Sequence, residues 1–326
     1  MMPCAPAVMY QAIREQLTMR QPVLLDGPMG SELVRRGVRW RKHGLVTDAD
    51  AVARLHDDYL AAGARVIRTN TFQLNPRVYR NVFRSGDHMR HIGAPGLEDL
   101  AQRLVRKSVQ LARESRQERN REAEAAIAGV LGPLEHCFRP DLAPAEDQAR
   151  REHEELARIF AEEKTDLLVA ESMNTIAEAR AALAAGRAAG LPVWISFVLG
   201  PEGDLLGREP LERAVGEMEA GGAEAVLVNC APPEDITRAL RRMSRYCRIP
   251  YGGFAHVGRF DPPSWKFEFH PQFVETDSWP PARYLAEARR WREAGGAILG
   301  GCCGTGPEHI RALGGWLGSG NGGSAR

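Results

Sequence analysis

The chain has 326 residues, 44% of them hydrophobic and 26% charged, a composition typical of a soluble globular protein rather than a disordered or fibrous one. Its 43 Lys and Arg residues nearly balance its 42 Asp and Glu residues, so no overall charge favours nucleic acid or an anionic membrane as partner. The sequence has no signal-peptide core and no apolar run of about 18 residues, and we therefore expect a cytoplasmic protein.

Eight short apolar or β-branched segments recur along the chain, and each precedes a stretch with helical spacing of apolar residues. This alternation predicts parallel strands joined by helices. The predicted strands are residues 23–27, 64–72, 127–133, 166–174, 192–200, 223–231, 249–257 and 296–304. Eight such units favour a (β/α)8 TIM barrel over a doubly wound α/β sheet, which more often has five or six strands. We predict one domain over residues 21–317, an N-terminal extension at 1–20 and a flexible tail at 318–326.

The connection between the second and third predicted strands, residues 72–127, is much longer than the other connections. It follows the C-terminal end of a strand, and TIM barrels form their active sites at that face. Two interpretations stay open at this point. The insertion is either a lid over the site or a solvated excursion without a chemical role.

Three of the six cysteines converge in this barrel. Cys230 ends the sixth strand and the adjacent pair Cys302 and Cys303 ends the eighth, so all three open onto the catalytic face. Neighbouring residues of a regular strand point to opposite sides, so the pair can bind one ion only where the backbone leaves strand geometry. The glycines that bracket the pair in the sequence GGCCG permit that departure.

Three thiolates with one open coordination position are typical of a catalytic zinc site. The alternative is that these cysteines are small buried hydrophobic residues, as we expect for Cys4, Cys137 and Cys247. His256, near the end of the seventh strand, is the other candidate ligand nearby, and we favour a non-ligand role for it. Zinc on three thiolates is a weak Lewis acid, which disfavours a hydrolase. It can instead bind a substrate thiol and keep it nucleophilic, which predicts alkyl transfer to sulfur.

Motifs along nearly the whole chain resemble the homocysteine S-methyltransferase family, which includes the betaine-dependent enzymes and the homocysteine-binding barrel of methionine synthase. They are, in order, LLDGPMGSEL, RTNTF, GVLGPL, ESMNT, ISFVLGPEGDLLG, VNCAPPE and GGCCGTGPEHI. The paired-cysteine motif with an upstream Asn-Cys is the most specific. The resemblance implies a (β/α)8 barrel, Zn2+ on Cys230, Cys302 and Cys303, and methyl transfer to the sulfur of homocysteine to give methionine.

The resemblance also implies that Asp26 and Glu171, after the first and fourth strands, hold the amino group of homocysteine. Carboxylates at two strand ends of one barrel face suit an ammonium group. The alternative for Asp26 is that it only forms a turn as part of an Asp-Gly pair, and the alternative for Glu171 is that it is an ordinary surface carboxylate.

Four further residues resemble family positions near the substrate pocket. Thr69, Asn70 and Thr71 match a segment that lines it, and Asn229 is expected to orient the adjacent ligand or to line the pocket. Strand seven, IPYGGFAHVG, lacks a pocket asparagine that many relatives carry, and what this changes stays open. Gly306 replaces a common hydroxyl residue but remains an acceptable helix N-cap before Pro307.

The methyl donor stays open between betaine, S-methylmethionine, related sulfonium compounds and a methylated corrinoid. The TNTF segment is nearer to the betaine-type and corrinoid-dependent branches. A chain of 326 residues has no room for folate and cobalamin domains beside a full barrel, so a corrinoid donor would need a separate partner protein. We expect a small onium donor. The alternative is the homocysteine-binding component of a corrinoid-dependent system, and nothing in the sequence indicates the oligomeric state.

Overall fold

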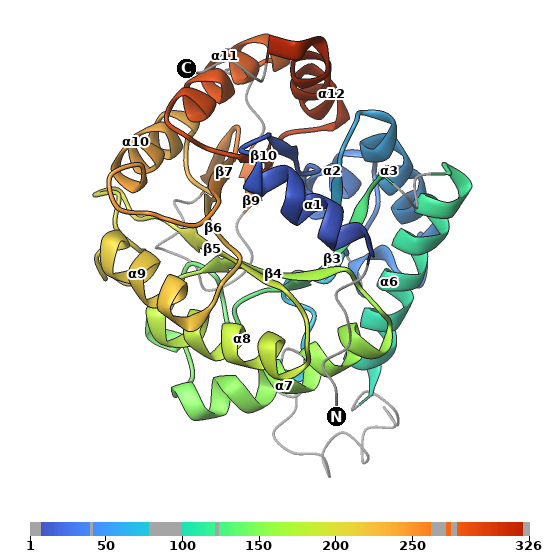
Figure 1. Cartoon of the computed structure of the whole chain (residues 1–326). Helices are drawn as coiled ribbons and strands as arrows, with labels where there is room; N and C mark the ends of the chain where they lie inside the picture. The colour runs from blue at the N-terminus through green and yellow to red at the C-terminus, as the bar shows by residue number, and fades with distance from the viewer. Residues whose placement is uncertain are drawn as a thin grey trace.

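In the computed structural model, parallel strands form a barrel and helices surround it (Figure 1). The structure describes residues 8–39, 42–77, 99–120, 124–261, 272–274 and 279–321. The eight barrel strands neighbour one another in the order β1-β10-β7-β6-β5-β4-β3-β2. A parallel bridge between Leu25 and Val66 joins the two ends of this order and closes the barrel. The prediction of a single (β/α)8 TIM barrel is confirmed.

Each of the eight predicted strands is present. The barrel strands are β1 (Val23–Leu24), β2 (Val66–Arg68), β3 (Ala126–Leu131), β4 (Leu167–Met173), β5 (Val193–Val198), β6 (Ala225–Asn229), β7 (Tyr251–Ala255) and β10 (Ile298–Gly301). Most predicted segments run further at the C-terminal end, because the residues there leave the hydrogen-bonded ladder and form loops at the barrel mouth. The antiparallel pair β8 (Arg259–Asp261) and β9 (Gln272–Val274) was not predicted and is not part of the barrel sheet.

A helix follows every barrel strand. These helices are α3 (Ala49–Ala61), α6 (Leu100–Glu118), α7 (Glu146–Glu162), α8 (Ile176–Ala188), α9 (Leu211–Gly221), α10 (Pro233–Met243), α11 (Pro281–Glu293) and α12 (Pro307–Trp316). The short helix α2 (Gly30–Arg35) precedes α3. Gly306 is the N-cap of α12 with Pro307 at the first helical position, as predicted, and the ring of His309 accepts a hydrogen bond from the Gly306 amide at 3.1 Å.

The core has two layers, and strand alternation divides the side chains between them. In β6, Ala225 and Leu227 lie inside the barrel, whereas Val226 and Val228 pack between the sheet and the helices. This alternation is the period of two that strand geometry imposes.

The predicted N-terminal extension is partly a helix, α1 (Val8–Thr18), which lies across the N-terminal end of the barrel (Figure 1). Tyr10 donates a hydrogen bond to Glu224 at 3.1 Å and accepts one from the indole of Trp194, also at 3.1 Å. Arg14 forms an ion pair with the same Glu224 carboxylate. Because α1 covers this end, the opposite end is where the site can open to solvent.

Two other predictions meet the limits of the described residues. Residues 78–98, part of the predicted insertion, lie outside them, so the lid and the solvated excursion both stay open. The predicted tail begins as a π-helical turn over Leu317–Asn321, and residues 322–326 are outside the described part of the chain. In the described ranges, no helix has both the length and the apolar character that a membrane span requires.

Strand β7 depends on glycine where it packs against its neighbour β10. A Cβ added at Gly252 would lie 1.9 Å from the carbonyl oxygen of Ile298, which belongs to the backbone and cannot rotate away. Gly216, in the middle of α9, has open space around its added Cβ. The two glycines therefore give opposite expectations for the same substitution.

We expect Gly252→Ala to lower the free energy of unfolding by about 3 kcal/mol, because the strand must shift to admit the methyl group. Gly216→Ala is the matched control and should raise the free energy of unfolding by about 0.5–1 kcal/mol, because alanine is the better helix former. Denaturant unfolding of both variants measures the difference. Equal effects of the two substitutions would contradict this packing.

Candidate functional site

Three cysteine thiols lie together at the C-terminal mouth of the barrel. Cys230 directly follows β6, and Cys302 and Cys303 directly follow β10. Their Sγ atoms all lie within 4.8 Å of one another, and the Sγ atoms of Cys230 and Cys302 are 2.9 Å apart. All three are free thiols. Distant points of the chain thus bring three sulfur atoms within reach of one ion.

The backbone leaves strand geometry at the cysteine pair, as the sequence predicted. Strand β10 ends at Gly301, and the amide and hydroxyl of Thr305 both donate to the carbonyl of Cys302, at 3.1 and 2.8 Å. A Cβ at Gly301 would lie 2.1 Å from the hydroxyl oxygen of Thr305, so this tight turn requires glycine. Cys230 has a φ of 51°, a left-handed conformation that costs a non-glycine residue about 1–3 kcal/mol and is typical of functional sites.

The clustered thiols shift one another's pKa. Hydrogen bonds from Cys230 and Cys302 hold the pKa of the Cys303 thiol well below its usual range, against the opposing effect of burial. Hydrogen bonding to the other two thiols, together with burial, raises the pKa of Cys230 well above its usual range. A group of three sulfur donors suits a soft divalent cation.

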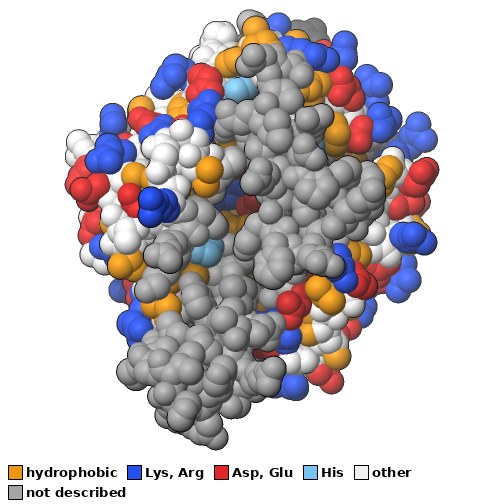
Figure 2. Space-filling model, turned by 180° about the vertical axis from the view of Figure 1, so that it is seen from behind, with side chains coloured by type: hydrophobic (Ala, Val, Ile, Leu, Met, Phe, Trp, Pro, Cys, Tyr) orange, Lys and Arg blue, Asp and Glu red, His pale blue; other side chains and the backbone are white. Residues whose placement is uncertain are grey.

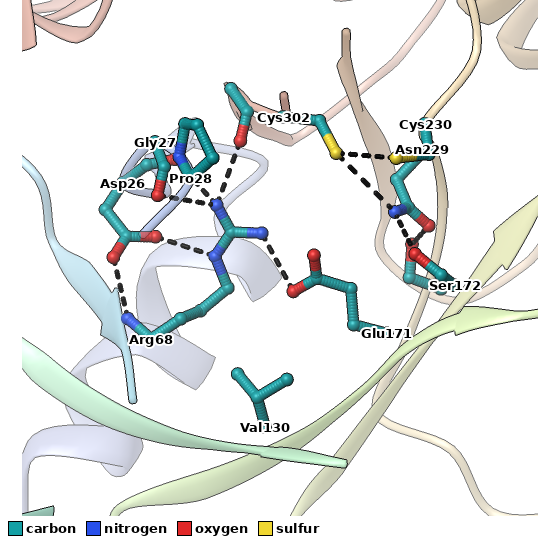
Figure 3. A network of polar contacts seen from close by, with 12 residues as sticks. Asp26, Gly27, Pro28, Arg68, Val130, Glu171, Ser172, Asn229, Cys230 and Cys302 are labelled. Atoms are coloured by element: carbon teal, nitrogen blue, oxygen red, sulfur yellow. Dashed lines mark hydrogen bonds and ion pairs between the residues drawn. The ribbon is translucent and has the colours of Figure 1, made fainter. Parts of the chain in front are cut away.

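A buried chain of hydrogen bonds supports the cluster from three neighbouring strands. Ser196 of β5 donates to the side-chain oxygen of Asn229 at 2.7 Å. The Asn229 amide donates to Ser172 of β4, also at 2.7 Å (Figure 3). The same amide nitrogen lies 4.0 Å from the Sγ of Cys302. Sequence analysis singled out Asn229 and missed both serines. Their common signal is a hydroxyl residue near the end of an apolar strand, on the same barrel face as the predicted ligands.

Arg68 lies between the two carboxylates predicted to bind the amino group (Figure 3). Its Nε donates to Asp26 at 2.7 Å and its Nη1 donates to Glu171 at 2.9 Å. Its Nη2 donates to the main-chain carbonyls of Asp26 and Gly27, both at 3.1 Å, and of Gly301 at 2.9 Å. Sequence analysis missed Arg68, although a cation inside an apolar strand is a signal, because it must find carboxylate partners when buried.

The two carboxylates have different surroundings. Asp26 is fully buried, and burial raises its pKa to about 6 although Arg68 opposes this. Burial also raises the pKa of Glu171, again against the effect of Arg68. The side chain of Glu171 is 12% exposed, and its second oxygen, which is not hydrogen bonded to Arg68, lies on the side of the site toward Cys302 (Figure 3).

The predicted substrate segment after β2 is buried and makes contacts to its neighbours. The Val130 amide donates to the hydroxyl of Thr69 at 3.0 Å, and the Thr71 hydroxyl donates to the Val130 carbonyl at 2.9 Å. The two threonine hydroxyls are themselves 2.8 Å apart. The Asn70 amide donates to the carbonyl of His43 at 2.7 Å. These contacts hold the end of β2 against β3, and a role in substrate binding remains a prediction.

Strand seven contributes an aromatic ring and an imidazole. The guanidinium carbon of Arg68 lies 4.7 Å from the centre of the Phe254 ring, a distance at which cation and ring attract each other. Burial lowers the pKa of His256, whose side chain is hydrogen bonded to the main chain of Cys230. Of the remaining cysteines of the described residues, Cys137 is buried, as expected, and belongs to an apolar cluster against which Cys230 packs, whereas Cys247 is partly buried. Cys4 is outside the described residues.

The outer surface at this end has mixed charge. Figure 2 views the face opposite to α1, and on the described residues Lys and Arg side chains alternate with Asp and Glu side chains around the rim. This distribution agrees with the formal net charge of +1.

Comparison with known proteins decides the family. The sequence profile described as homocysteine S-methyltransferase matches residues 23–317, most of the chain. The chain belongs to the homocysteine S-methyltransferase family. It is 27% identical to betaine–homocysteine S-methyltransferase 1 of Danio rerio, over 95% of this chain and 76% of that protein. It is also 27% identical to the homocysteine S-methyltransferase of Escherichia coli K12, over 92% of this chain and 97% of that one.

The same barrel occurs in a solved structure. The metallated form of the homocysteine methyltransferase MmuM from Escherichia coli superimposes with a TM-score of 0.75 and 24% identity, covering 93% of this chain and 99% of that chain. This likeness confirms the fold. Membership of the family identifies the protein as an S-methyltransferase that acts on homocysteine, as the sequence motifs implied.

We expect Ser196→Ala to weaken the binding of Zn2+, added as a probe of the cysteine cluster, by about 10–100-fold, because Asn229 then loses the hydroxyl that orients its amide near the cluster. The free energy of unfolding should fall by about 1–3 kcal/mol, because the Asn229 oxygen is left without a donor. Competition with a chromophoric chelator measures the affinity. Ser115→Ala in α6 removes another buried hydroxyl, which donates to the Ala53 carbonyl, and should leave Zn2+ binding unchanged. Equal Zn2+ affinity in both variants would contradict the role of Ser196.

Proposed function

We propose that this protein transfers a methyl group from a small onium donor to the thiol of homocysteine, giving methionine, with Zn2+ held by Cys230, Cys302 and Cys303. The observation that carries the proposal is the group of three free thiols within 4.8 Å of one another beside the partly exposed carboxylate of Glu171. These two features match the thiol and the ammonium group of homocysteine. Family membership supports the acceptor, and the donor and the metal are our proposals.

The donor set fits zinc. The three ligand atoms are all sulfur, and soft sulfur donors favour Zn2+ over the hard cations Mg2+ and Ca2+. When bound, Zn2+ supplies a coordination position at which the homocysteine thiol loses its proton and stays nucleophilic. Three thiolate ligands make the ion a weak activator of water, which is why hydrolysis is disfavoured.

The residues of the chain position both substrates for an in-line displacement. The second oxygen of Glu171 holds the ammonium group of homocysteine, and the hydrogen-bonded chain through Asn229 orients the cysteine ligands. The sulfur of homocysteine then forms a bond to the methyl carbon while the bond from that carbon to the donor nitrogen or sulfur breaks. The electron pair of the broken bond stays on the donor, which leaves as a neutral amine or thioether group.

An apolar cluster with aromatic rings supports a small onium donor over a corrinoid protein. Phe138 and Val198 are buried in this cluster, and Phe72 and Cys230 pack against it. The faces of aromatic rings attract quaternary ammonium and sulfonium groups. The donor methyl would thus be presented next to the cysteine cluster. The free thiols agree with a reducing compartment, so we also propose a cytoplasmic location.

We expect Cys302→Ala to abolish both Zn2+ retention and methionine formation, because the two remaining thiols cannot hold the ion tightly. Metal content by atomic absorption and methionine by chromatography are the measurements. Cys247→Ala is the matched control, since this partly buried thiol donates to the Ile249 carbonyl away from the cluster. It should keep both properties. A Cys302→Ala enzyme that is metal-free and active would refute the mechanism.

Glu171→Gln should raise the KM for homocysteine by about 10–100-fold while Zn2+ stays bound, because the ion pair between carboxylate and ammonium is replaced by a hydrogen bond to an uncharged amide. The KM for the analogue 4-mercaptobutanoate, which is homocysteine without its amino group, should rise far less. Loss of the metal from this variant, or equal loss of activity toward both thiols, would show that Glu171 has another role.

The donor is tested by incubating the Zn2+-loaded protein with homocysteine and one methyl donor at a time. The donors are betaine, S-methylmethionine, S-adenosylmethionine and methylcobalamin, and methionine is measured in each reaction. We expect methionine from an onium compound without any partner protein. Methionine only with a methylated corrinoid would favour the corrinoid-dependent system, and none with any donor would count against the proposed function.

A further inference from the structure

The two carboxylates expected to share the ammonium group are not equally available. Asp26 is fully buried, and both of its oxygens accept hydrogen bonds from Arg68, one from Nε at 2.7 Å and one from the main-chain amide at 2.8 Å. Glu171 is 12% exposed and gives only one oxygen to Arg68, at 2.9 Å. An incoming cation therefore meets Glu171 before it can meet Asp26.

Arg68 cannot readily move aside for a substrate. Its side chain is 4% exposed, and its guanidinium group donates to two carboxylates and three main-chain carbonyls. The ring of Phe254 lies 4.7 Å from its central carbon. Displacing the group would leave a buried carboxylate and several carbonyls without donors, and each such loss is costly.

The charge of this part of the site is consistent with one bound ammonium group. Asp26 and Glu171 bring two negative charges and Arg68 brings one positive charge, so their sum is negative by one. An ammonium group would neutralise it. In a buried site of low effective dielectric constant, this balance affects binding strongly.

We propose that Arg68 separates the roles of the two carboxylates: Asp26 anchors Arg68 and does not contact the acceptor, whereas Glu171 alone binds the ammonium group through the oxygen that Arg68 leaves free. The inference rests on the proposed function, since it concerns how homocysteine is held. Arg68 is a positioning residue in this arrangement. It sets the charge of the pocket and the orientation of the Glu171 carboxylate.

The test is a charge-restoring pair of substitutions. The measured quantity is the ratio of the dissociation constant of 4-mercaptobutanoate to that of homocysteine, obtained by calorimetry on the Zn2+-loaded protein, and it isolates the contribution of the ammonium group. Asp26→Asn makes the sum of charges zero and should lower the ratio by about tenfold or more. Adding Arg68→Gln restores the sum to negative one and frees both oxygens of Glu171, so the double variant should recover to within about threefold of the wild type.

Direct contact between Asp26 and the ammonium group gives a different result. The double variant would then lack that contact and would recover only in part, to well below about a third of the wild-type ratio, which would overturn the inference. A wild-type protein that binds no homocysteine would overturn the proposed function and the inference together. Wild-type binding without recovery in the double variant would overturn the inference alone.

Asp166→Asn is the control for loss of a buried ion pair. Asp166 forms an ion pair with Arg116 at 2.7 Å and accepts a hydrogen bond from the Ile127 amide, also at 2.7 Å. Asp26 likewise pairs with an arginine and accepts a hydrogen bond from a main-chain amide. Asp166, however, lies just before β4, at the other end of the barrel. Its substitution should lower stability without changing the ratio. If the double variant does not fold, a structure of the wild type with homocysteine decides. The homocysteine nitrogen should lie about 3 Å from Glu171, and a nitrogen at that distance from Asp26 would overturn the inference.

Discussion

A buried guanidinium group connects the strand ends that build this site. Arg68 belongs to β2. Its partners are Asp26 after β1, Glu171 within β4 and Gly301 at the end of β10. A cation in this position is stable only when several acceptors surround it, because the interior solvates charge poorly. The arginine and its acceptors therefore require one another, and their mutual contacts fix where Glu171 presents its remaining oxygen.

The other half of the site follows from sulfur chemistry and backbone geometry. The cysteines reach one another because β6 and β10 are both neighbours of β7, whose double glycine lets the adjacent strands approach closely. A turn after Gly301 and a left-handed residue at Cys230 then direct the thiols to one point. The two halves, a sulfur cluster and a carboxylate, lie at the same barrel mouth, and α1 covers the opposite end. Such an arrangement is complementary to a small amino acid with a thiol, as expected for the family.

Sequence reasoning was most successful where a physical period or a specific residue type carried the signal. Apolar runs at regular intervals predicted every barrel strand, and the rule that strand C-termini share one face predicted that Cys230 would meet Cys302 and Cys303. It was weakest for single polar residues inside apolar strands. Arg68, Ser172 and Ser196 all occurred in quoted motifs, but no role was predicted for any of them, because their roles depend on partners contributed by other strands.

The sequence by itself determined the architecture, the family and which three cysteines lie together, because periodicity and motif order are properties of a linear chain. Only the tertiary structure decided how Asp26 and Glu171 differ. The difference consists of burial and of hydrogen bonds from Arg68, which is more than forty positions from Asp26 and more than a hundred from Glu171 in the sequence. Likewise, no pattern in residues 8–18 revealed that they seal one end of the barrel through Tyr10 and Glu224. Such contacts form between segments that only the fold brings together.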